Sequence, residues 1–280
     1  MADLIDAIIQ TRKTAANIFV KSLTGIVGKS EAEVRDKILQ EAKNHREIFE
    51  TGWYDPPAGG LGILFADYPF KRLKYDSLRK PDYAPNKNIT FGKERVGMVY
   101  SSFVDRKTKM LGDIGFPLYV GQNEKIKQHI KNVYNAILGV AEHAKVGMKF
   151  SDLCLFSENL FRNKFKPTRW IIVSKNLNQP TNLGHTIPGS LGDNLVFGNT
   201  IEKIKETIRT NRVFIINNEN FSIPENCAFT LESRLEDTND PDMPSVYFHF
   251  IIIFNNGEKM ILKNFNEIFN AIGMDYINVK

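Results

Sequence analysis

The chain has 280 residues, 42% of them hydrophobic and 25% charged, which is the composition of a globular protein large enough to bury its own core. No apolar run approaches the length of a transmembrane helix, and the first nine residues lack the basic region of a signal peptide, so we expect a cytoplasmic protein with no membrane partner. The net charge of +5 raises the question of nucleic acid, but the densest basic stretch, residues 71–75 with Arg79 and Lys80, is more typical of a solvated loop.

The first 120 residues predict two helices followed by strands. Apolar residues recur at helical spacing over residues 3–23. Ser30, with Glu33 three residues later, forms a capping-box signature at the start of a second helix over residues 31–47. Strands are predicted at residues 62–65, 89–91, 96–104 and 114–120, and the polar turn 105–109 joins the last two into a hairpin.

The second half begins with a predicted helix over residues 123–143 and another after Gly147, with Ser151 as its N-cap. An amphipathic helix is predicted over residues 200–209, and the turn Asn255-Asn256-Gly257 indicates a hairpin. Strands are predicted at residues 170–173, 212–216, 227–231, 246–254 and 259–263, and the last helix covers residues 265–272.

Two short segments in the two halves share one pattern. Residues 28–34 and 147–153 each begin with Gly, carry an acid five residues later and then an apolar residue, and each stands between two predicted helices. We interpret this as a duplication within a single domain, with related α+β halves at about 1–120 and 121–280 that share one sheet.

Four segments offer side chains of metal-ligand type in strand-like surroundings: Asp113 in residues 111–115, His185 in 183–189, Glu232 in 229–232 and His249 in 246–250. Residues so far apart in the chain converge only if a folded scaffold brings them together. The spacing therefore predicts a metal or catalytic centre built on a sheet rather than on one loop.

The ordered set of motifs resembles the pita-bread metallopeptidase family, which comprises methionine aminopeptidase, aminopeptidase P, prolidase and the metal-free creatinase. The resemblance runs over residues 3–275 and rests on "GKSEAEV", "MLGDIGFPLYVG", "GMKFSDL", "NLGHTIPG", "AFTLES" and "VYFHFIIIFNNGEKMIL". It implies an α+β fold with duplicated halves around a curved, mainly antiparallel sheet, and it leaves a homodimer open as the oligomeric state.

In that family two Asp, one His and two Glu hold two metal ions, and the resemblance places Asp113 on the second Asp, His185 on the His and Glu232 on the first Glu. This donor set suits Mn, Fe, Co or Zn. Paired ions of this kind activate a bridging water. The resemblance therefore implies at most one divalent transition metal here, held by these three residues with or without His249, or no metal at all.

The departures from the family pattern concern the remaining ligands. Ser102 stands where the first Asp belongs, eleven residues before Asp113. The last Glu falls on His249 in one register and on Phe248 in a register shifted by one, and only one of these two side chains can face the site. A second family His corresponds to Gly192, and no His precedes the Asp hairpin between His45 and His129. Ordinary two-metal peptide hydrolysis is therefore not expected.

Each candidate residue also has a structural interpretation. Asp113 is of a type common in turns, His185 and His249 could be core histidines, and Glu232 in an apolar strand needs a partner or a metal. Cys154 and Cys227 are interpreted as reduced thiols, with Cys154 a buried structural residue rather than a nucleophile.

Three functional hypotheses follow from the resemblance. The first is a divergent hydrolase with an altered metal centre that acts on a small amide, an amino-acid derivative or a peptide. The second is a non-catalytic relative that uses the cleft to bind a peptide, a protein or nucleic acid. The third is metal-free catalysis of the creatinase type, in which His185 acts as acid and base.

Overall fold

The computed structural model describes residues 2–167, 183–192 and 195–277. Within this part the chain forms a seven-stranded sheet in the order β1-β2-β3-β6-β5-β4, with β7 paired to β6, and every strand pairing is antiparallel. The strands are β1 (Leu61–Ala66), β2 (Val96–Ser101), β3 (Ile114–Leu118), β4 (Phe165–Pro167), β5 (Cys227–Asp237), β6 (Val246–Asn255) and β7 (Glu258–Leu262). The predicted strand at residues 170–173 lies outside the described residues.

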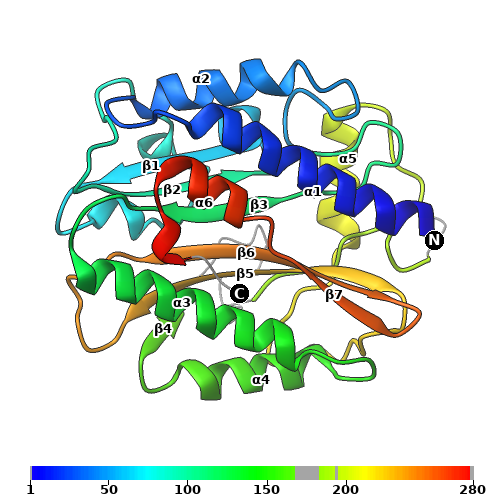
Figure 1. The fold of residues 1–280 in the computed structure, drawn as a ribbon. Helices are drawn as coiled ribbons and strands as arrows, with labels where there is room; N and C mark the ends of the chain where they lie inside the picture. The colour runs from blue at the N-terminus through cyan, green and yellow to red at the C-terminus, as the bar shows by residue number, and fades with distance from the viewer. Residues whose placement is uncertain (1, 168–182, 193–194, 278–280) are drawn as a thin grey trace.

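Helices cover one face of this sheet. Figure 1 shows α1, α3 and α6 in front of the strands, and α2 packs beside α1 as α4 packs beside α3. The helices are α1 (Ala2–Leu23), α2 (Glu31–Ala42), α3 (Glu124–His143), α4 (Phe150–Phe161), α5 (Ile201–Asn211) and α6 (Asn266–Ile272). No helix of the described residues is long and apolar enough to cross a membrane. Cys154 and Cys227 are buried and free.

Most predicted elements are confirmed, including the Ser30–Glu33 capping box at the start of α2, but four details were wrong. Helix α2 ends at Ala42, because polar residues with no apolar stripe follow it. Residues 89–91 pair with the turn before α2 rather than with a strand, through Phe91 N to Lys29 O at 2.7 Å. Residues 212–216 form only an isolated bridge between Phe214 and His185. The N-cap of α4 is Lys149 without a side-chain bond, so Ser151 lies inside the helix.

The two faces of the sheet carry different chemistry. On the helix face, Phe248 and Phe250 of β6 pack on Tyr134 of α3 at ring distances of 5.2 and 5.5 Å. The opposite face, here called the site face, carries Tyr100, Asp113, Glu232, Tyr247 and His249. This assignment follows from the register, in which Gly115 pairs with Tyr100 and His249, and His249 also pairs with Glu232. His249 rather than Phe248 therefore faces the site.

The strands of the two predicted halves meet in the middle of the sheet. Strands β1–β3 come from the first half and β4–β7 from the second, and they join where Gly115 of β3 pairs with His249 of β6. The turns before α2 and α4 also correspond, since Gly28 and Gly147 both have positive φ and each turn bridges to a later segment. The duplication stays a prediction, and these shared features agree with it.

Candidate functional site

Asp113 lies on the site face immediately before β3, with its side chain buried. Trp53 Nε1 donates to both carboxylate oxygens at 3.0 and 3.1 Å, and the Tyr100 hydroxyl donates to Oδ2 at 3.1 Å. Burial raises the pKa of Asp113 to about 7, although both donors act in the opposite direction. Protein donors thus satisfy the Asp113 carboxylate. Such an arrangement suits a structural role as well as a functional one.

His185 and Glu232 form the second element of the site. His185 Nδ1 lies 2.8 Å from the Thr186 carbonyl, which can only accept, so Nδ1 carries the proton and Nε2 is free to accept. Glu232 Oε1 lies 3.5 Å from that Nε2, and its side chain is 17% exposed. Burial lowers the pKa of His185 to about 3 and raises that of Glu232 to about 8. At neutral pH the contact joins a neutral imidazole and a carboxylic acid rather than an ion pair.

His249 meets a buried arginine instead of an acid. The Arg12 guanidinium, supplied by α1, lies with Nη1 3.5 Å from His249 Nδ1, and its side chain has no exposed area. Burial lowers the pKa of Arg12 to about 9, which leaves it charged at neutral pH. Two unit charges 4 Å apart interact by about 4 kcal/mol at an effective dielectric constant of 20. A divalent ion on His249 would therefore face strong repulsion.

The remaining ligand positions of the family pattern do not supply donors to a metal. The buried Ser102 hydroxyl accepts from Tyr54 N at 3.0 Å and donates to Gly60 O at 3.1 Å, so backbone groups engage its proton and one of its lone pairs. Phe248 packs in the helix layer. Within the described ranges no group of three His, Cys, Asp or Glu side chains could hold a metal ion. The residues present therefore do not fit the family's metals, and a ligand role for the candidate residues stays a prediction that this geometry does not support.

Two further arginines stand beside Glu232. The charge of Arg212 lowers the pKa of Glu232, and the charge of Arg79 lowers the pKa of Arg212, which places all three groups in one electrostatic cluster. The Arg79 guanidinium lies 4.2 Å from the centre of the Tyr54 ring. Arg212 lies 4.7 Å from the Phe214 ring and 5.5 Å from that of Trp53. The cluster therefore combines two cations with aromatic walls.

Arg79 reaches the cluster because a long loop between β1 and β2 is fastened to β5. The buried Arg234 of β5 donates to the carbonyls of Leu73 and Tyr75, and its guanidinium lies 3.8 Å from the Tyr75 ring centre. Lys74 Nζ donates to Pro241 O at 2.6 Å. The basic stretch predicted as a solvated loop thus makes internal contacts on the site face.

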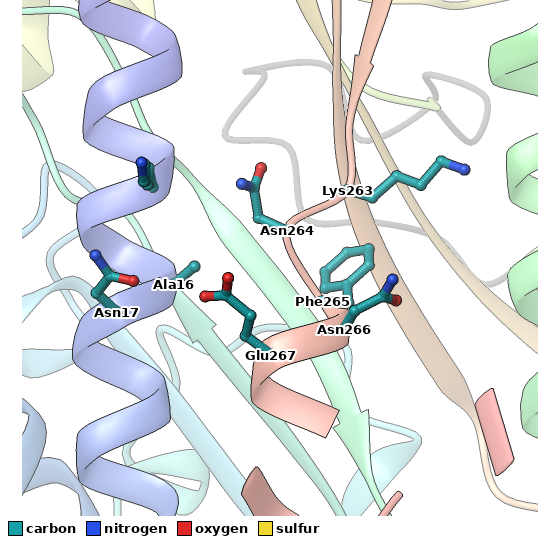
Figure 2. A pocket seen from close by; sticks show the side chains of 8 residues that line it. Ala16, Asn17, Lys263, Asn264, Phe265, Asn266 and Glu267 are labelled. Carbon is teal, nitrogen blue, oxygen red and sulfur yellow. The ribbon is translucent and has the colours of Figure 1, made fainter. Parts of the chain in front are cut away.

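A separate pocket of about 200 Å³ opens on the helix face. It lies between α1 and the segment that joins β7 to α6, where Figure 2 shows Asn17, Asn264 and Glu267 around it. Lys263 and Phe265 line this pocket and also contact Arg12, through the Lys263 carbonyl at 2.9 Å and the Phe265 ring at 5.3 Å. Two residues that line the pocket therefore also contact Arg12, the residue that reaches His249.

Sequence reasoning missed the three arginines. Arg12 left a readable signal, since it occupies a helical position in line with the buried Ile5, Ile8 and Phe19 and so had to be buried and paired. Arg79 and Arg212 left none, because their positions depend on contacts distant in the chain. Trp53 is a core residue, with 1% of its surface exposed.

No protein-family model matches this sequence, and no curated protein is significantly similar to it. Solved structures, in contrast, match nearly the whole chain. The X-Pro aminopeptidase from Thermotoga maritima superposes with a TM-score of 0.62 over 94% of this chain and 61% of its own length, at 14% identity. The proline aminopeptidase P II from Yersinia pestis gives 0.63 over 98% of this chain and 60% of its own length, at 10% identity.

The methionine aminopeptidase from Thermotoga maritima gives a TM-score of 0.61 at 13% identity, over 92% of this chain and 96% of its own length. The chain thus spans about three-fifths of the two larger relatives and nearly all of the smaller one. These likenesses show the fold alone: the chain has the α+β pita-bread fold predicted from its motifs. Identities this low carry no activity from one protein to the other.

Proposed function

We propose that this protein is a metal-independent binding protein whose site face takes a small molecule, or the end of a peptide, that carries a carboxylate. Arg79 and Arg212 would receive the anion, and the rings of Tyr54 and Trp53 would flank it. The proposal departs from the hydrolase favoured by the sequence, because the residues at the expected metal positions are engaged with protein groups or with a cation.

The proposal rests on buried donor atoms of the two guanidinium groups that lack hydrogen-bond partners. Nε and Nη2 of Arg79 and Nε of Arg212 are buried and have no hydrogen-bond partner among the described residues. An unsatisfied buried donor costs about 1–3 kcal/mol. The two like charges also repel each other, as the effect of Arg79 on the pKa of Arg212 indicates. An anion between them would satisfy the donors and relieve the repulsion.

A carboxylate suits this arrangement better than a neutral ligand. The guanidinium fork matches the two oxygens of a carboxylate and bonds to them in pairs. Glu232 does not compete for the arginines as an anion at neutral pH, since burial raises its pKa to about 8. Its protonated carboxyl group remains partly exposed and can donate one further hydrogen bond to a ligand carbonyl or carboxylate.

A second candidate function is metal-free acid catalysis, and the protonated Glu232 favours it. A carboxyl group with a pKa near the working pH is an effective proton donor. His185 is less suited to this role than the sequence suggested, because a pKa of about 3 leaves no imidazolium at neutral pH. Glu232 rather than His185 would then be the acid.

Ligand titration followed by tryptophan fluorescence tests the proposal. Trp170 is replaced by Phe, so that Trp53 beside Arg212 becomes the only reporter of the two tryptophans in the chain. The probes are N-acetyl amino acids as free acids and as the corresponding amides. We expect the acids to bind and the amides to bind at least about tenfold more weakly.

Matched variants separate the two arginines from general charge. Arg79→Gln and Arg212→Gln should each weaken binding of the acids, whereas Lys80→Gln and Arg209→Gln remove neighbouring exposed charges and should leave it unchanged. Equal affinity for acids and amides, or equal losses in all four variants, would contradict the proposal. Turnover of a chromogenic amide that disappears in Glu232→Gln, without an effect of Arg79→Gln, would favour the catalytic alternative.

A further inference from the structure

Arg12 occupies the point at which the sheet divides. Strands β3 and β6 share the single pair Gly115–His249 and are not paired beyond it; we call the region around this pair the fork. The Arg12 guanidinium lies in this fork: Nη1 donates to Asp113 O, and Nη2 donates to His249 O at 2.7 Å. Nη2 also donates to Lys263 O at 2.9 Å. One side chain thus bonds to the carbonyls of three segments of the sheet: the residue before β3, a residue of β6 and the residue after β7.

The approach of α1 to the fork is built into the sequence. Helix α1 passes so close to Gly112 that a Cβ there would lie 2.5 Å from Thr11 C and 2.6 Å from Arg12 N. Real Cβ atoms essentially never come so near to backbone. Glycine at position 112 therefore lets the helix backbone approach, and this approach brings the guanidinium within reach of Asp113 and His249.

The guanidinium also bears on the neutral form of His249. A guanidinium only donates, so a proton on Nδ1 would face the donor Nη1 at 3.5 Å, and we expect the imidazole proton on Nε2 instead. Nε2 has no hydrogen-bond partner among the described residues. Neither nitrogen then offers a lone pair to a metal ion, since one carries the proton and the other faces a cation.

We propose that Arg12 is a built-in cation that replaces a metal ion at this end of the site. It binds the fork together, balances the charge of the buried Asp113 and keeps His249 from acting as a metal ligand. On the outer side the pocket of Figure 2 adjoins the same side chain at Lys263 and Phe265, and no ligand is assigned to it. This inference goes beyond the proposed carboxylate site and does not depend on it.

The form of His249 is the first test, and it needs no substitution at Arg12. Long-range proton–nitrogen NMR on the labelled full chain, with His249→Gln to assign the signal, distinguishes the two neutral forms of the ring. We expect Nδ1 without a proton and Nε2 with one. A proton on Nδ1 would overturn the proposal.

The second test uses Co²⁺ as the probe, through the paramagnetic broadening of the His249 ring signals. These signals should remain sharp in the natural chain and in the control Lys13→Met, which removes an exposed charge from the next position of α1. Arg12→Met should make them broaden at Co²⁺ concentrations at least about tenfold lower. Broadening in the natural chain, or a folded Arg12→Met variant that behaves like it, would overturn the proposal. If Arg12→Met does not fold, two measurements on the natural chain decide on the proposal: the position of the His249 ring proton by NMR and the Co²⁺ titration.

Discussion

Nε2 of His185 lies 3.5 Å from Oε1 of Glu232, and burial moves the pKa values of the two groups in opposite directions. In a solvated pair the imidazole would gain a proton and the carboxyl group would lose one. Here the acid keeps its proton and the imidazole remains neutral, because a buried charge costs more than this long contact returns. The two pKa shifts therefore predict how the free energy of unfolding changes with pH.

The folded-state pKa of Glu232 is about 8, above the ordinary value of 4.5 that applies to the unfolded chain. The folded protein thus holds a proton that the unfolded chain releases, so this contribution to stability is complete below pH 4.5 and is lost as the pH rises through 8. Glu232→Gln has no carboxyl group to ionise. We expect the free energy of unfolding of the natural chain to fall relative to that of the variant by roughly a few kcal/mol between pH 5 and 9.

Denaturant unfolding of both proteins across this pH range measures the effect. Glu225→Gln, an exposed substitution, is the control and should give a curve parallel to that of the natural chain. A constant difference between the natural chain and Glu232→Gln at all pH values would show that Glu232 is ionised in the folded protein. His185 acts in the opposite sense, since its lowered pKa gives stability that is present above pH 6.5 and lost as the pH falls toward 3.

An ion pair outside the site, between the buried Glu31 and the half-buried Arg72, fixes the loop that carries Arg79. Both Glu31 oxygens accept from Arg72, at 2.9 and 2.8 Å, and they also accept from the Phe65 and Asn86 backbone amides. Glu31→Ala leaves Arg72 and two amides without their acceptor, and it should cost about 3–5 kcal/mol in the free energy of unfolding. Asp36→Ala, which breaks an exposed pair with Arg35 on the same helix, should cost less than about 1 kcal/mol. Similar losses for the two variants in a denaturant titration would contradict the assignment.

The close contact between α1 and Gly112 predicts that alanine destabilises the protein there, in contrast to alanine at an uncrowded glycine. Gly112→Ala places a methyl group against the backbone of Thr11 and Arg12, so it should cost about 3 kcal/mol and lower the melting temperature. Gly139→Ala lies inside α3, where the nearest atom to the new Cβ is Leu160 Cδ2 at 3.4 Å, and it should stabilise the protein by up to about 1 kcal/mol. Thermal unfolding of both variants gives the comparison, and a neutral Gly112→Ala would show that α1 is free to move away.

The long periodic elements could be predicted from sequence, and the short ones could not. Helices α1 and α3 have an apolar stripe over many turns, and β6 is a long apolar run before an Asn-Gly turn. Residues 89–91 and 212–216 have the same composition as strands, but a tertiary partner decides whether a short apolar run joins a sheet. Residues 89–91 pair with the turn before α2, and residues 212–216 form a single bridge with His185.

The grouping of the candidate residues on one face of the sheet was predictable from the sequence, and their chemistry was not; that they form a functional site stays a prediction. Asp113, His185 and Glu232 could be placed from their motifs, and the last two are in contact. The sequence could not decide whether Phe248 or His249 faces the site. Strand β6 is buried on both faces, so its residues show no alternation of apolar and polar types that would mark the site face. Arg79 and Arg212 come from distant segments, so only the assembled fold reveals them, whereas the burial of Arg12 follows from its helical position among apolar residues.

Placing an acid at position 102, where the pita-bread metallopeptidases have their first Asp, should fail to create a metal site. The Ser102 hydroxyl bridges Tyr54 N and Gly60 O, and a Cβ at Gly52 or Gly60 would overlap it, so no space exists for a carboxylate. Ser102→Ala should cost about 1–2 kcal/mol for the lost bonds. Ser102→Asp should cost more, because it buries a charge against a carbonyl oxygen, and it should bind no Zn²⁺ or Co²⁺ in a dialysis measurement. A stable Ser102→Asp variant that holds one equivalent of metal, and loses it on Asp113→Ala, would show instead that the site can hold a metal ion and lacks only this one ligand.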